Sequence, residues 1–162
     1  AQGACMMTDT TVDFEILGEN HDNKMNFTLA ELAYQCMSDI GAPKFTEEEK
    51  AYAREVAKNV GIEGVKGDMD ESILPVDKTI KKDNGSSDIA DVSQIVPVVN
   101  INTACYGRKT PNHSWAVTVQ TDKSAAHKGM IFAAKTLAFM GARLATEPEL
   151  LEKVKEEFKT AE

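Results

Sequence analysis

The stretch that decides the fold reads QIVPVVNINTACYGRKTPNHSWAVTVQT and covers residues 94–121. Its first part, residues 94–104, is apolar and β-branched over the length of a strand, with Pro97 near an edge or the strand's start. In its last part, residues 115–121, large apolar residues alternate with small or polar ones, which is the period of a half-buried strand. The stretch therefore predicts two strands joined by a polar loop.

Segments with the apolar spacing of helices surround this stretch. The motif T-x-x-E, in which a threonine and a glutamate cap the first helical turn, opens three of them at Thr28, Thr46 and Thr146. Gly41 and Gly61 end the first two. Four helices are therefore predicted, over residues 28–40, 46–60, 124–145 and from 146 onward.

The first residues follow a different pattern. Residues 1–7 are small and apolar and resemble the end of a helix, and residues 10–17 alternate as a strand would. The polar, turn-rich residues 18–26 then form the one candidate domain boundary. Residues 62–87 show little periodicity and predict an irregular surface excursion. Together these elements predict an α/β fold in which helices pack on a mixed sheet.

Composition excludes several classes of partner. The chain has 18 Lys and Arg against 26 Asp and Glu, a net charge of -8 that repels nucleic acid and anionic membranes. No apolar stretch approaches the roughly 20 residues that span a bilayer, and no signal-peptide pattern is seen. Three scattered cysteines, Cys5, Cys36 and Cys105, form no zinc or disulfide pattern. We therefore expect a cytoplasmic protein in a reducing compartment.

Histidines and carboxylates are the candidates for chemistry. His113 follows the turn-forming Pro111-Asn112 pair, where a scaffold can aim a loop side chain into a cleft, and imidazole is a common metal ligand. Asp88 and Asp91 have the spacing of a helix cap or of carboxylates that support a metal site. From spacing alone, a structural role is the simpler interpretation of His113 and of these acids.

Two further histidines are weaker candidates. His127 begins the long predicted helix, and His21 lies in the polar connection, where solvation is the simpler interpretation. The sequence contains no GxSxG elbow, phosphate-binding loop or HExxH motif. The motifs that usually identify serine hydrolases, nucleotide-binding proteins and single-helix zinc proteases are therefore missing from it.

Several segments, in this order, carry a resemblance to a known family. They are TLAEL (28–32), GSSDIADVSQIVP (85–97), TPNHSW (110–115), AHKGMIFAAK (126–135) and EPELLEKVKEEF (147–158). Over nearly its whole length the chain resembles the C-terminal part of di-metal amidohydrolases and peptidases of the aminoacylase and carboxypeptidase type. Within that family it is similar to the hydrolases of aminobenzoyl-glutamate utilization.

The resemblance implies a domain organisation. Such enzymes have a catalytic α/β domain and an inserted βαββαβ lid domain that often mediates dimerisation. Residues 1–20 would then be the last helix and strand of the lid. Residues 21–162 would be the C-terminal portion of the catalytic domain, with an irregular excursion at 62–87.

The resemblance also implies roles for single residues. His113 matches the family's C-terminal metal-binding histidine, while Asp88, Asp91 and His127 would support the site. No catalytic or substrate-binding residue is assigned in this chain. The family's first metal-binding motif, its bridging aspartate and its Glu-Glu pair have no counterpart here, so the chain alone is expected to be inactive.

For the full-length enzyme the resemblance implies hydrolysis of an amide by metal-activated water, on an N-acyl amino acid, aminobenzoyl-glutamate-like or dipeptide-like substrate. Two divalent ions, zinc or else manganese, are expected as cofactors. The expected partners are the missing N-terminal half of the same protein and a second copy in a homodimer, with no nucleic acid or membrane. The alternative is a non-catalytic binding or assembly module.

Overall fold

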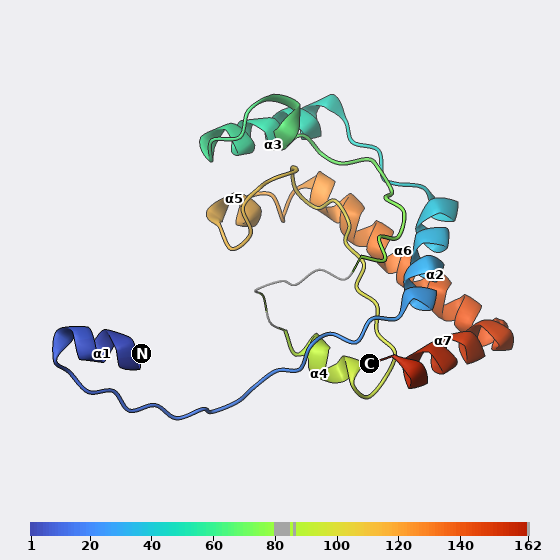
Figure 1. The fold of residues 1–162 in the computed structure, drawn as a ribbon. Coiled ribbons are helices and arrows are strands. Elements are labelled where there is room, and N and C mark those ends of the chain that lie inside the picture. Colours follow the sequence, from blue (N-terminus) through green and yellow to red (C-terminus); the bar gives the residue numbers. More distant parts are fainter. Residues whose placement is uncertain (80–84, 86, 162) are drawn as a thin grey trace.

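The structure is a computed structural model that describes residues 1–79, 85 and 87–161. Within these residues every regular element is a helix, and no strand occurs (Figure 1). The predicted α/β fold with a mixed sheet is therefore wrong for this chain. The elements are α1 (Gln2–Thr8), α2 (Phe27–Ile40), α3 (Glu47–Asn59), η1 (Gly64–Gly67), α4 (Ile89–Ser93), α5 (Trp115–Thr118), α6 (Ser124–Thr146) and α7 (Pro148–Thr160).

The three predicted strands each fail for a physical reason. Residues 10–17 are exposed and run away from the other helices, so no neighbouring backbone completes a ladder (Figure 1). Residues 97–104 have no regular structure, although Val99 and Ile101 pack against the core. Their apolar pattern indicates burial, which does not by itself require strand pairing. The helix α5 replaces the strand predicted over 115–121.

The predicted helices are confirmed, but only one of the predicted capping boxes is. At the start of α3, Glu49 N donates to Thr46 Oγ1 at 3.2 Å and Thr46 N donates to Glu49 Oε2 at 2.7 Å. The cap of α2 is Asn26, whose Oδ1 accepts from Leu29 N, and not Thr28.

The cap of α7 also differs from the prediction. Thr146 is the last residue of α6, and Glu147 precedes α7 without a side-chain hydrogen bond to its first turn. Pro148 occupies the first turn of α7 as expected, because its missing N–H has no helical partner at that position.

The core lies among α2, α6 and α7. A second, smaller apolar cluster joins α3 to the start of α6 through Phe45, Ala53, Met69 and Ala125. The main cluster consists of Leu29, Leu32, Ala33, Cys36, Met140 and Val154.

No helix in the described part of the chain is long and apolar enough to cross a membrane.

Residues 1–20 are separate from this core. The short helix α1 buries no residue, and an extended segment connects it to the rest of the chain (Figure 1). The lid strand expected here is not formed. The irregular excursion predicted at 62–87 holds the short helix η1 and otherwise no regular structure up to residue 79; residues 80–84 and 86 lie outside the described residues.

Candidate functional site

His113 lies in a loop that runs from Cys105 to Ser114, just before α5. Its side chain is exposed and its backbone is left-handed, with φ 56°. Lys109 in the same loop has φ 64°. Such conformations cost non-glycine residues on the order of 1 kcal/mol or more, and they persist only where surrounding contacts hold them. Two of them within five residues indicate a loop with a fixed shape.

Gln120 braces this loop from inside. Its side chain is buried, with the residue only 3% exposed. Its Oε1 accepts from Gly107 N at 3.0 Å, and its Nε2 donates to Ala116 O at 2.7 Å. Thr110 Oγ1 donates to Gly107 O at 2.6 Å and closes the turn between them. One amide group therefore ties both ends of the His113 loop together.

Replacing Gln120 with leucine is expected to lower the free energy of unfolding by about 1–3 kcal/mol, since the buried N–H of Gly107 and the carbonyl of Ala116 lose their partner. Urea unfolding followed by circular dichroism measures this change. The matched control is Gln2→Leu on α1, where the glutamine is exposed. Equal unfolding midpoints for the two variants would show that the brace contributes nothing.

The loop also rests on a close backbone contact. A Cβ atom on Gly107 would overlap with the carbonyl oxygen of Gly67, and one on Gly67 would overlap with the Cβ of Ala57 on α3. Next to this contact, Arg108 N donates to Asp68 O at 2.8 Å. The His113 loop is therefore held against α3 through the segment that includes η1.

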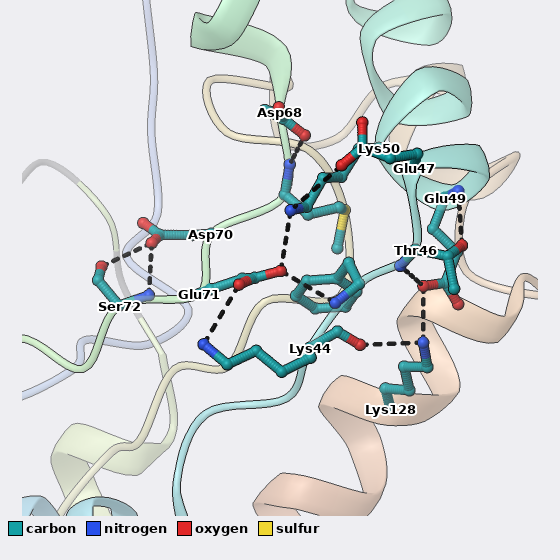
Figure 2. A network of polar contacts seen from close by, with 12 residues as sticks. Lys44, Thr46, Glu47, Glu49, Lys50, Asp68, Asp70, Glu71, Ser72 and Lys128 are labelled. Carbon is teal, nitrogen blue, oxygen red and sulfur yellow. Dashed lines mark hydrogen bonds and ion pairs between the residues drawn. The ribbon is translucent and has the colours of Figure 1, made fainter.

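Ion pairs fix that segment in place (Figure 2). Arg54 on α3 donates to Asp68 Oδ2 at 2.8 Å. The carboxylate of Glu71 accepts from Phe45 N at 3.0 Å and pairs with Lys50 at 3.1 Å and Lys44 at 3.3 Å. Residues 68–71 are thereby attached to α3 and to the turn that precedes it.

A second carboxylate joins α3 to α6. Glu49 accepts from Lys128 Nζ at 2.6 Å (Figure 2). It also accepts from Ser124 Oγ at 2.6 Å, and its side chain is 10% exposed. Burial raises the pKa of Glu49, but the hydrogen bonds from Lys128, Ser124 and Thr46 outweigh it and lower that pKa to about 2. The backbone hydrogen bond from Phe45, followed in size by the side-chain hydrogen bond from Lys50, lowers the pKa of Glu71 to about 2.

These lowered pKa values predict sensitivity to acid. Because Glu71 has a pKa near 4.5 when unfolded and about 2 when folded, the unfolded chain takes up the proton first. The ionised carboxylate of Glu71 therefore stabilises the fold above about pH 4.5, and this stabilisation is lost as the pH falls from about 4.5 toward 2. We expect Glu71→Gln to lose less stability across this range than the unchanged protein does.

Urea unfolding midpoints at the two ends of the range measure the acid effect. Glu48→Gln, an exposed change on α3, is the control and should keep the full dependence on pH. A Glu71→Gln protein that loses as much stability in acid as the unchanged protein would contradict the assignment.

The structure places Asp91 on α4 and Asp88 directly before it, away from His113. Asp88 precedes α4 and makes no side-chain cap, whereas Asp91 accepts from His21 N at 3.1 Å and lies 2.7 Å from His21 Nδ1. The hydrogen bond from His21 lowers the pKa of Asp91. In Figure 1, α4 and α5 lie well apart. The pairing with His21 had no signal in the sequence.

His127 is exposed in the first turn of α6. Across the described ranges, no three His, Cys, Asp or Glu side chains meet where they could hold a metal ion. Since a catalytic zinc needs about three protein ligands, these residues do not form a complete metal site around His113 by themselves.

A cavity opens beside the His113 loop. Its volume is about 650 Å³, and it lies between α2, residues 70–77 and residues 99–109. Tyr106 lines it, and the Tyr106 hydroxyl donates to Asn112 Oδ1 at 3.0 Å. The residue that precedes His113 is therefore bonded to the wall of the cavity, which the sequence did not indicate.

Comparison with known proteins adds one relative. No protein-family model and no solved structure matches the chain. The chain is 29% identical over 180 aligned positions to a subunit of the p-aminobenzoyl-glutamate hydrolase of Escherichia coli strain K12. The alignment covers 97% of this chain and 37% of that protein, so the chain spans a little over a third of the relative's length. The resemblance found in the sequence is therefore confirmed: this chain is similar to part of a hydrolase subunit.

Proposed function

We propose that the whole protein hydrolyses the amide bond of an aminobenzoyl-glutamate-like substrate, an N-acyl amino acid or dipeptide-like compound. The observation that carries this proposal is the similarity to the p-aminobenzoyl-glutamate hydrolase subunit over 97% of the chain. The braced loop around His113, which adjoins a cavity of suitable size for a small ligand, supports it. In this proposal the loop forms one wall of the active site.

His113 is proposed as a ligand of a divalent ion, zinc or manganese. An exposed imidazole on a loop of fixed shape suits that role, because imidazole is the commonest side-chain metal ligand. The other ligands would come from outside the described residues, since these hold no further cluster of metal-binding groups. The supporting roles of Asp88, Asp91 and His127 stay predictions.

The test is an assay of the protein expressed from its whole coding sequence. We expect release of p-aminobenzoate from p-aminobenzoyl-glutamate, loss of that activity with a chelator, and recovery when zinc or manganese is added back. Absence of hydrolysis in the metal-supplemented protein, or hydrolysis that a chelator does not change, would refute the proposal.

We also propose that the whole protein is a homodimer that uses the outer side of α6. On the inner side Phe132 and Met140 are buried, while on the outer side Met130 and Leu137 are 56% and 54% exposed. A helix that is apolar on both sides is normally buried on both sides by other parts of the protein or by a partner. The relative's description as a subunit agrees with an assembly.

Leu137→Glu is therefore expected to weaken dimerisation about tenfold or more, because it places an unpaired charge in an apolar interface. Light scattering after size exclusion measures the mass of each variant. Lys135→Glu, an exposed change on the same helix, is the control for a new negative charge alone. A monomeric unchanged protein would contradict the dimer.

A further inference from the structure

The cavity beside the His113 loop has one apolar wall. Residues 73–76, with the sequence ILPV, line it without a charged side chain, and Leu74 is 74% exposed. Met37 and Ala33 of α2 add further apolar surface. Exposed apolar surface in a concave site favours a flat or aliphatic ligand group that removes it from water.

Another part of the cavity lining is polar. Asn100 and Asn102 line the cavity two positions apart in a segment without helical structure. In an extended chain, residues two apart point to the same side, and the alternate residues Val99 and Ile101 pack against the core. Within the part of the chain that the structure describes, neither amide side chain has a hydrogen-bonding partner. Each therefore offers a donor and an acceptor to a ligand amide.

Among the charged residues that line the cavity, one positive group has no acidic partner in the described part of the chain. Asp70 accepts from Ser72 N at 2.9 Å and from Ser72 Oγ at 2.6 Å, and it lies 3.9 Å from Arg108. Asp77, farther along the same segment, accepts from a backbone amide. Lys109 also lines the cavity, and no acidic group among the described residues pairs with it.

The conformation of Lys109 is a second feature. Its backbone is left-handed, with φ 64°. Thr110, the next residue, donates from both N and Oγ1 to Gly107 O, and these two hydrogen bonds close the turn that contains Lys109. Strained residues of this kind concentrate at ligand sites, where the cost is balanced by contacts elsewhere. The backbone that carries Lys109 is thus fixed beside a cavity that the apolar residues 73–76 also line.

We propose that this cavity binds the carboxylate-bearing substrate of the proposed hydrolase, an N-aroyl amino acid. Lys109 binds a carboxylate, Asn100 and Asn102 bind the amide, and residues 73–76 cover the aromatic ring. The inference rests on the proposed function for the choice of ligand. The Tyr106–Asn112 hydrogen bond connects this subsite to the residue next to His113.

Equilibrium binding tests the subsite separately from catalysis. The probes are p-aminobenzoyl-glutamate and p-aminobenzamide, which shares the ring and the amide but has no carboxylate. Calorimetry is done in the His113→Asn protein, whose turnover the proposed function expects to be low. Lys109→Asn, which removes the charge but tolerates the left-handed backbone, is expected to weaken binding of p-aminobenzoyl-glutamate about tenfold. It should leave p-aminobenzamide unchanged.

Lys153→Asn, the same substitution at an exposed position on α7, is the control and should leave both dissociation constants unchanged. Equal weakening of both probes by Lys109→Asn, or no weakening, would overturn the inference. So would a failure of p-aminobenzoyl-glutamate to bind at millimolar concentration.

The outcomes separate the two proposals. If the unchanged protein hydrolyses the substrate and Lys109→Asn has the same KM, the subsite is wrong and the function stands. If no hydrolysis occurs but Lys109→Asn weakens binding of the carboxylate probe selectively, the subsite stands and the function is wrong.

Discussion

Replacing His113 with asparagine is expected to lower hydrolysis of p-aminobenzoyl-glutamate by the whole protein by about a hundredfold or more. A metal ligand or its immediate support usually contributes at least this much to activity. Asparagine is chosen because the backbone of His113 has φ 56°, and asparagine adopts that left-handed conformation more readily than alanine does. The change therefore removes the imidazole with little effect on the loop.

His21→Asn is the matched control for this experiment. His21 is also exposed, but it pairs with Asp91 beside α4, away from the His113 loop. We expect its turnover number to equal that of the unchanged protein. If His113→Asn retained full activity, or if both variants lost activity equally, His113 would have no special role in the reaction.

Gly107→Ala is expected to lower the free energy of unfolding by about 3 kcal/mol. The new Cβ would overlap with the carbonyl oxygen of Gly67, a backbone atom that cannot move without shifting η1 against α3. Such overpacking typically costs about 1–3 kcal/mol and sometimes more. The same shift would displace the His113 loop, so activity should fall together with stability.

Gly141→Ala on α6 is the control, since nothing lies near its Cβ position. Alanine in a helix interior is favoured over glycine by roughly 0.5–1 kcal/mol, so this variant should be more stable than the unchanged protein. Urea unfolding of both variants measures the difference. Equal stability of Gly107→Ala and the unchanged protein would show that the two glycines do not make the described contact.

Local sequence signals predicted the helices well. The Thr46–Glu49 capping box depends on residues three apart, and the structure contains it. The cap predicted at Thr28 was wrong because Asn26 takes that role. The carboxylate of Glu157 also accepts from Phe27 N and Thr28 N, at 2.7 and 2.8 Å. Contacts between residues so far apart in sequence leave no local pattern.

The predicted sheet failed for a related reason. Alternating or β-branched apolar residues indicate burial on one side, and in residues 97–104 that burial is provided by helices. His113 was identified correctly as a loop residue, but what shapes its loop was missed. Gln120 and Gly67 hold the loop through a buried amide and a backbone contact, neither of which has a distinctive sequence motif.

The most direct test of the central claim is the divalent-metal content of the whole protein, measured by elemental analysis beside folding checks. If His113 is a ligand in the active site, the His113→Asn protein should stay folded and lose bound zinc or manganese, while the His21→Asn protein keeps it. Full metal content in folded His113→Asn protein would contradict the account.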